Sequence, residues 1–189
     1  RSRAVKLAGG VVGYCEAGRG SSILFLHGLN GGATSWSEQF ADFSGRHRVI
    51  AWDAPGYGKS DAIEPSVDAY ASAAANLISS LGATPAAVVG HSMGGIVAAK
   101  LARLRPDLVN RLVLSCTHWG HGLAVGSSLP AAYVRRLDEH RGNTPSEYGR
   151  IRARTMLPPG ASPEVMARVA RIAAEVSGVA LEQVVAAGG

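Results

Sequence analysis

The chain has 189 residues, of which 47% are hydrophobic and 17% are charged, and its formal net charge is +5. This is the composition of an ordinary globular protein that is large enough to bury a core. The basic residues are scattered, without a basic stripe interleaved with aromatic residues, which disfavours nucleic-acid binding. No apolar run is long enough to span a membrane, and residues 1–15 lack the apolar core of a signal peptide, so we expect a cytoplasmic protein without membrane partners.

The two cysteines, Cys15 and Cys116, both lie in apolar stretches that are typical of strands. We therefore expect buried free thiols instead of a disulfide bond. Neither the cysteines nor the histidines have the spacing of metal ligands, and the glycine-rich segments lack the spacing of phosphate or dinucleotide loops. The sequence accordingly predicts neither a metal site nor a cofactor.

The first half of the chain alternates strand-like with helix-like segments, as expected for a parallel sheet covered by helices on both faces. Short apolar runs predict strands at 11–15, 22–27, 48–52, 86–89 and 111–116. Apolar residues at helical spacing predict helices at 33–43 and 67–81, and another that follows residue 92 and reaches residue 104. The predicted fold class is α/β, with a mostly parallel sheet flanked by helices.

The pattern changes after Gly122, where the strand signals disappear. Amphipathic stretches then predict helices at 131–140, 146–156, 163–176 and 179–187. We interpret residues 1–121 as an α/β core, and residues 122–189 as a helical lid that ends with the start of the return to the core.

The most informative motif is the G-x-S-x-G segment from Gly90 to Gly94, which lies between an apolar strand and an apolar helical stripe. Glycines two positions before and two positions after Ser92 allow a tight strand-to-helix turn. Such a turn strains the serine backbone, exposes its hydroxyl and directs the first amide groups of the helix toward a bound group. A glycine-rich turn with a spectator serine is the alternative, and the flanking strand and helix disfavour it. Ser92 is therefore predicted as a nucleophile for acyl chemistry.

A second glycine-rich segment, residues 27–32, follows the second predicted strand. A tetrahedral intermediate needs two amide donors for its oxyanion, and loss of one typically costs about 3 kcal/mol of transition-state stabilisation. We predict that the N–H groups of Leu29 and Met93 supply them. His27 is interpreted as a buried histidine bonded to the loop backbone, in preference to a proton-transfer group.

Together these residues resemble the α/β-hydrolase family, and the resemblance covers nearly all of the chain. Three landmarks follow in the family's order: His27 and Gly28 at the oxyanion strand, the loop 53–61 after the next strand, and the elbow at Ser92. Within the family the chain is similar to lidded esterases and lactonases of the 3-oxoadipate enol-lactonase type. The resemblance implies Ser92 as the nucleophile, an oxyanion hole from the residues named above, and a lid that shapes the acyl pocket.

The resemblance also identifies two acidic residues, Asp53 and Asp61, as fasteners of the loop after the third strand and not as catalytic acids. In the family the triad acid and histidine follow later strands. Those strands are missing from this sequence, so we expect it to be part of a longer enzyme, and we expect the isolated chain to be weakly active or inactive. The strand 111–116 would then form an exposed sheet edge.

Directly after that strand stand His118, Trp119 and His121, where the family has an alternative position for the acid. The carboxyl ends of parallel strands are where ligands collect, so either histidine could approach Ser92. The preferred interpretation is that they line the pocket or meet solvent. His118 and Trp119 are therefore candidates for the substrate pocket, with ordinary core packing as the alternative.

The leading hypothesis is a cofactor-free serine hydrolase that cleaves a small, mostly apolar carboxylic ester or lactone through an acyl-enzyme on Ser92. The expected partner is thus a small-molecule substrate. A C–C bond hydrolase or a cofactor-free haloperoxidase on the same scaffold stays open, as does a ligand-binding homologue without catalysis, because a fold does not determine chemistry.

Overall fold

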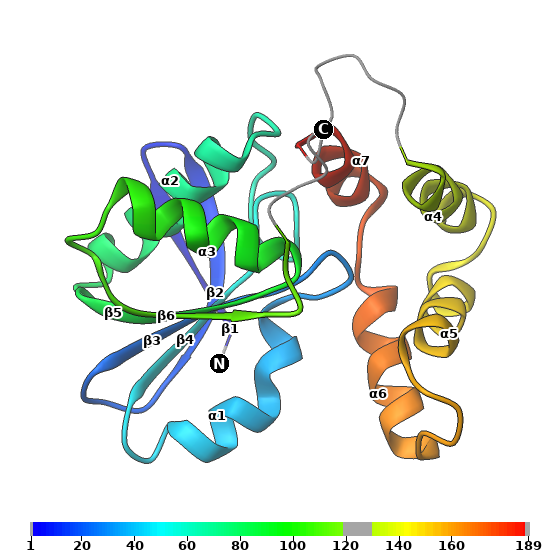
Figure 1. Ribbon diagram of the computed structural model, residues 1–189, viewed down its shortest axis with the longest axis horizontal. Helices are drawn as coiled ribbons and strands as arrows, with labels where there is room; N and C mark the ends of the chain where they lie inside the picture. The colour runs from blue at the N-terminus through cyan, green and yellow to red at the C-terminus, as the bar shows by residue number, and fades with distance from the viewer. Residues whose placement is uncertain (1, 119–129, 188–189) are drawn as a thin grey trace.

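A computed structural model describes residues 2–118 and 130–187 of the chain (Figure 1). Within these residues the sheet has six strands in the spatial order β1-β2-β4-β3-β5-β6. The strands are β1 (Ser2–Leu7), β2 (Gly10–Ala17), β3 (Ser22–Leu26), β4 (Arg48–Trp52), β5 (Ala86–His91) and β6 (Val109–Ser115). Strands β4, β3, β5 and β6 are parallel, whereas β1 and β2 form an antiparallel edge beside β4. The predicted α/β class, with a mostly parallel sheet, is confirmed.

Helices cover both faces of this sheet, with α2 and α3 on one face and α1 on the other (Figure 1). The helices of this part are the short 3-10 helix η1 (Ala33–Trp36), α1 (Ser37–Phe43), α2 (Val67–Ser80) and α3 (Met93–Leu104). Side chains alternate between the two faces along each strand. On β3, Leu24 and Leu26 join the large core under α2 and α3, while Ile23 and Phe25 pack with the smaller cluster that includes Phe40 of α1.

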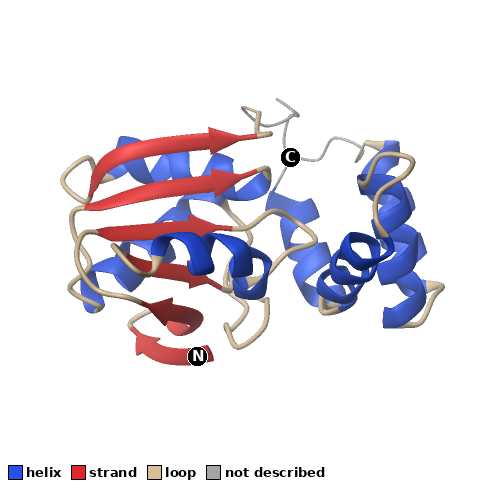
Figure 2. Ribbon diagram, turned by 90° about the horizontal axis from the view of Figure 1, so that it is seen from below, coloured by secondary structure: helices blue, strands red, loops and turns tan. Residues whose placement is uncertain are grey.

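Four further helices, here called the C-terminal helices, lie beyond the carboxyl ends of the parallel strands (Figure 2). They are α4 (Ala131–Arg141), α5 (Pro145–Met156), α6 (Pro163–Ala174) and α7 (Gly178–Ala187). Thr144 and Ser162 cap α5 and α6, and each is followed by proline at the start of the helix, where a missing N–H costs nothing. A side chain at Gly149 would overlap the carbonyl oxygen of Ala170, so glycine permits the close packing of α5 on α6.

Polar contacts attach the C-terminal helices to the core. The Tyr148 hydroxyl donates to Asn30 Oδ1 at 2.8 Å, and Gln183 Nε2 donates to the Ile63 carbonyl at 2.7 Å. Arg168 on α6 forms an ion pair with Glu38 on α1. The contacts therefore join α5, α6 and α7 to three separate segments of the core.

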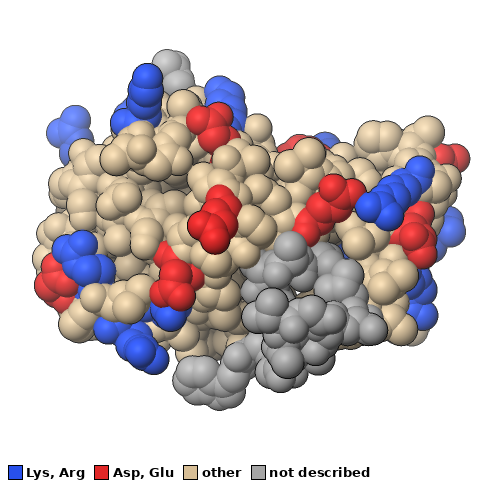
Figure 3. Space-filling model, turned by 90° about the horizontal axis from the view of Figure 1, so that it is seen from above, with Lys and Arg blue, Asp and Glu red and all other residues tan. Residues whose placement is uncertain are grey.

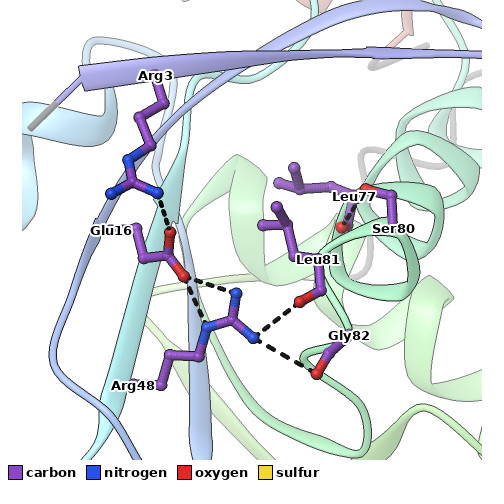
Figure 4. A network of polar contacts seen from close by, with 7 residues as sticks. All are labelled: Arg3, Glu16, Arg48, Leu77, Ser80, Leu81 and Gly82. Carbon is purple, nitrogen blue, oxygen red and sulfur yellow. Dashed lines mark hydrogen bonds and ion pairs between the residues drawn. The ribbon is translucent and has the colours of Figure 1, made fainter.

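At the other end of the sheet, an ion-pair network joins the antiparallel strands to the parallel ones (Figure 4). Glu16 on β2 accepts from Arg3 on β1 at 2.9 Å and from Arg48 on β4 at 2.6 Å. Arg48 Nη1 also donates to the Leu81 carbonyl just after α2, at 2.8 Å. Because a carbonyl at a helix end has no intrahelical partner, this bond satisfies one such group.

Charged side chains of both signs are interspersed on the face seen in Figure 3, without one large patch of a single sign. This distribution agrees with the scattered basic residues of the sequence. In the described part of the chain, no helix combines the length and the apolar character needed to cross a membrane.

The predicted elements agree with the structure apart from shifts of a few residues at their ends, and three predictions differ in kind. Strand β1 was not predicted, because this edge strand is mostly exposed and carries charged residues such as Arg3 and Lys6. The predicted helix 33–43 begins as a 3-10 turn. The expectation of a buried Cys116 is wrong: β6 ends at Ser115, so the thiol follows the strand and is exposed, while Cys15 is half-buried. Both are free thiols, as expected.

Strand β6 forms the exposed sheet edge that the sequence predicts. It is the last strand in the order of the described sheet, and Leu112, Val113 and Leu114 are 39%, 50% and 43% exposed. These three apolar side chains are thus partly exposed at the edge of the described sheet.

Two leucines of the sheet, one buried and one on the exposed edge, should lose different amounts of stability when each is replaced by alanine. Leu24→Ala should lower the free energy of unfolding by about 2–5 kcal/mol, because Leu24 is fully buried. Leu112→Ala, the matched control on the exposed edge, should change it by less than about 1 kcal/mol. Urea unfolding followed by circular dichroism measures both, and equal losses would contradict the assignment of the core.

Candidate active site

Ser92 occupies the sharp turn between β5 and α3. Its backbone has φ 53° and ψ −120°, a conformation that L-residues rarely adopt and that typically costs about 1–3 kcal/mol. The turn is fixed by the Ser92 N–H, which donates to the Ser115 carbonyl at 2.9 Å, and by Thr117 Oγ1, which donates to the Ser92 carbonyl at 2.7 Å. The surrounding bonds therefore hold the strained serine in place.

The two glycines of the motif are required by close backbone packing. A Cβ atom at Gly90 would overlap the Gly94 carbonyl, and one at Gly94 would overlap the Leu26 carbonyl at the end of β3. Helix α3 consequently begins in contact with the strand ends, and Ser92 is placed at the carboxyl edge of the sheet.

The glycine-rich segment 27–32 lies directly against this turn. A Cβ atom at Gly28 would stand 2.9 Å from His91 Nδ1 and 3.1 Å from the Ser92 Cβ atom. Tyr57 holds the segment in place, because its hydroxyl donates to the Leu29 carbonyl at 2.8 Å. Burial raises the pKa of the Tyr57 hydroxyl well above its ordinary value, which keeps the group protonated as a donor.

Two amide groups remain available near the serine. The N–H of Met93 begins helix α3, where the first amides have no intrahelical acceptor, and the N–H of Leu29 lies in the adjoining loop. In the described part of the chain, neither N–H donates a hydrogen bond to another protein group. Their arrangement is compatible with the predicted oxyanion hole, which stays a prediction.

His27 is buried and serves to join two loops. Its Nε2 accepts from the Ala54 N–H at 2.9 Å, so the proton resides on Nδ1, which donates to the Gly28 carbonyl at 2.8 Å. Burial lowers the pKa of the imidazole and keeps it neutral. This geometry agrees with the interpretation of His27 as a histidine bonded to the loop backbone.

The acidic residues after β4 also fasten loops. Asp53 Oδ1 accepts from the Ala33 N–H at 2.9 Å, and its Oδ2 accepts from the Lys59 N–H at 3.3 Å. Asp61 Oδ2 accepts from the Val11 N–H at 2.8 Å. Both carboxylates therefore have the structural role that the sequence suggested.

A cavity of about 940 Å³ opens between the core and the C-terminal helices, and Ser92 lines it. The Leu29 loop, helix η1, strands β3, β5 and β6, and helices α1, α4, α5 and α6 contribute the other walls. Apolar side chains from both parts line it, among them Phe25, Trp36, Val89, Met156, Val169 and Ile172. The charged side chains in the lining are Glu38, Arg136, Arg152 and Arg168.

The predicted site residues are only partly brought together. Ser92 and Leu29 line the cavity, and the Met93 side chain packs against the core below it. His118 is exposed and is not part of the lining, so its role in the pocket stays a prediction. Trp119 and His121 lie outside the described residues.

Arg136 and Arg152 are functional candidates that the sequence analysis missed. Both lie on amphipathic helices, where an arginine is ordinarily assigned to the solvent face. Their place in the cavity depends on which helix face meets the core, and no local pattern specifies that.

In the parts of the chain that the structure describes, no group of three or more His, Cys, Asp or Glu side chains could hold a metal ion.

The sequence and the structure of the chain were both compared with those of known proteins. Residues 22–170 match the family model of the alpha/beta hydrolase fold. The chain belongs to the α/β-hydrolase family. Among solved structures, an esterase from Exiguobacterium antarcticum superposes on this α/β-hydrolase with a TM-score of 0.85 and 19% identity, over 100% of the chain and 73% of the esterase. At this identity the likeness shows the fold alone.

Relatives by sequence match the α/β-hydrolase over part of their length. An (E)-2-((N-methylformamido)methylene)succinate hydrolase from Acinetobacter baylyi is 33% identical over 103 residues, which are 53% of this chain and 39% of the relative. A 2-hydroxy-6-oxo-6-phenylhexa-2,4-dienoate hydrolase from Burkholderia cepacia is 35% identical over 129 residues, 65% of this chain and 45% of the relative. The chain thus spans less than half the length of these two curated relatives.

The buried neutral state of His27 predicts a pH-dependent stability. The unfolded chain binds a proton near the ordinary pKa of 6.5, whereas the folded chain binds it only at lower pH. The free energy of unfolding should therefore fall as the pH drops below about 6.5, by up to about 1.4 kcal/mol per pH unit from this group. The stabilisation is fully present above that pH.

Urea unfolding between about pH 5.5 and pH 7 measures this slope. His27→Gln should reduce the slope, because the variant lacks the group whose proton uptake differs between the folded and unfolded chain. An NMR titration in which the His27 imidazole protonates at or above pH 6.5 would contradict the prediction.

Proposed function

We propose that Ser92 is the nucleophile of a hydrolase that cleaves carboxylic esters or lactones. The observation that carries the proposal is the strained turn that presents Ser92 to a cavity next to the Leu29 loop. In the proposed reaction, Ser92 Oγ attacks the carbonyl carbon, and the oxyanion accepts hydrogen bonds from the N–H groups of Leu29 and Met93. The C–O bond to the alcohol then breaks, the alcohol leaves with a proton, and water hydrolyses the resulting acyl-enzyme.

A serine hydroxyl needs a general base to act at neutral pH. In residues 2–118 and 130–187, no histidine or carboxylate hydrogen-bonds the Ser92 hydroxyl. The general base of the proposed reaction is therefore not assigned to a described residue. The C-terminal helices act in this proposal as a lid, because α4, α5 and α6 supply one wall of the cavity.

A C–C bond hydrolase is the second candidate. Two relatives, from Comamonas testosteroni and Burkholderia cepacia, are named 2-hydroxy-6-oxo-6-phenylhexa-2,4-dienoate hydrolase. Both candidates place the reacting carbonyl at the same cavity. Turnover of that dienoate in preference to simple esters of similar size would favour the second candidate.

Labelling by a fluorophosphonate tests the nucleophile. The intact protein should be labelled at Ser92, as located by mass spectrometry of its peptides, and Ser92→Ala should abolish labelling. Ester turnover by the same variant should fall at least about a thousandfold, because only binding and oxyanion stabilisation remain.

The matched control for labelling is Ser79→Ala, which removes an exposed hydroxyl on α2. It should be labelled as fast as the wild type. Labelling of Ser92→Ala at the wild-type rate would overturn the assignment of the nucleophile.

A further inference from the structure

Thr117, which follows the end of β6, contacts the elbow at Ser92 through its side-chain hydroxyl. Its Oγ1 donates to the Ser92 carbonyl at 2.7 Å, and this carbonyl also accepts from the Gly95 N–H at 2.8 Å. Cys116, with φ 48°, turns the chain between β6 and Thr117. The Thr117 side chain is half-buried and is not part of the cavity lining. Any effect of this hydroxyl on a bound substrate must therefore pass through the elbow.

The Ser92 carbonyl belongs to the same peptide unit as the Met93 N–H. A trans peptide is planar, so its C=O and N–H groups point in opposite directions, and a bond that fixes the carbonyl also fixes the N–H. Donation to the carbonyl oxygen polarises the peptide as well, which strengthens its N–H as a donor. The Thr117 hydroxyl therefore acts on the amide that is predicted to bind the oxyanion, from the side opposite to the reacting group.

The packing of Thr117 limits where its hydroxyl can lie. A Cβ atom at Gly95 would stand 2.5 Å from the Thr117 Cβ atom and 2.8 Å from its methyl carbon. The threonine thus lies directly on the first turn of α3, in space that glycine leaves free. Because the branched Cβ restricts the side-chain rotamer, the methyl contact and the hydroxyl bond hold the side chain in one orientation.

The second predicted oxyanion donor has the same arrangement. The Leu29 N–H shares its peptide unit with the Gly28 carbonyl. That carbonyl accepts from His27 Nδ1 at 2.8 Å and from the Gly31 N–H at 2.9 Å. Each predicted donor is thus paired with a carbonyl that is held by a side-chain donor and by the backbone. Two amides that must keep a fixed direction would need such bonds, because a preorganised donor does not reorient during the reaction.

We propose that Thr117 is a positioning residue of the elbow, whose hydroxyl fixes the direction of the Met93 N–H toward the oxyanion. This inference rests on the proposed function of Ser92 and assigns a further residue to the same site. Thr117 acts only through the peptide between Ser92 and Met93. Loss of its hydroxyl should weaken the bond to the oxyanion more than it weakens substrate binding, because the oxyanion forms only as the reaction proceeds.

Hydrolysis of p-nitrophenyl butyrate by the intact protein tests this role. Thr117→Val replaces the hydroxyl by a methyl group, and it should lower kcat between about tenfold and a hundredfold with little change in KM. Thr117→Ser keeps the hydroxyl and should retain most of the turnover. Urea unfolding of the same variants separates this effect from a loss of stability, which by itself would not change kcat of the folded protein.

Thr155→Val is the matched control for removal of a threonine hydroxyl. Thr155 also donates to a carbonyl, that of Ile151 at 2.8 Å, but from an exposed position on α5 that is outside the cavity lining. This variant should keep the kcat of the parent. Should Thr117→Val fail to fold by circular dichroism, Thr117→Ala is the second variant, with the same expected loss of kcat.

NMR of the intact protein, with methionine as the only isotope-labelled residue, observes the Met93 amide without turnover. The sequence contains three methionines, Met93, Met156 and Met166, and Met93→Leu identifies the cross-peak of the first. Thr117→Val should shift this cross-peak and leave the other two in place, because a bond to the preceding carbonyl changes the electron density at the amide nitrogen. Thr117→Ser should leave the cross-peak closer to its parental position.

An unmoved Met93 cross-peak in folded Thr117→Val would overturn the proposal, and so would unchanged turnover by that variant. An equal loss of kcat in Thr117→Ser would do the same, since the hydroxyl is then not the group that matters. The two proposals fail separately. Absent labelling of Ser92 together with the expected cross-peak shift would reject the nucleophile alone, whereas normal labelling with an unmoved cross-peak would reject the positioning role alone.

Discussion

The close approach of helix α3 to the end of strand β3 is the constraint on which the site depends. Gly94 leaves room for the Leu26 carbonyl, and Gly90 leaves room for the backbone of Gly94. A side chain at either position would push the helix away from the sheet, and Ser92 would lose its strained geometry. Because β3 also leads into the loop that carries Leu29, this contact fixes the serine and the loop relative to each other.

The buried polar groups that hold the loops around Ser92 differ in their hydrogen bonding from those that line the cavity. His27 and Asp53 use their side-chain nitrogens and oxygens to hold loops, and each has protein partners that offset the cost of burial. Arg136 and Arg152 instead retain buried donors without described partners. His27 and Asp53 are thus satisfied by partners in the described protein, whereas these two arginine nitrogens are not.

The sequence predicted features that depend on local patterns. Short apolar runs located the parallel strands, and apolar residues at helical spacing located most helices. The spacing of Gly90, Ser92 and Gly94 located the elbow, because a tight turn has strict steric needs. Features that depend on distant partners were missed. Strand β1 is stabilised by pairing with β2, and the place of Arg136 depends on how α4 meets the core.

Asn30 links helix α5, which forms part of the cavity wall, to the segment that carries the Leu29 amide. Its Oδ1 accepts from the Tyr148 hydroxyl at 2.8 Å, and its Nδ2 contacts the Met156 sulfur at 3.7 Å, so both ends of the amide are engaged by α5. Asn30 immediately follows Leu29 in the chain. The position of α5 and the position of the Leu29 amide are therefore linked through a single peptide unit, so that a shift of this helix relative to the core would reach that N–H group.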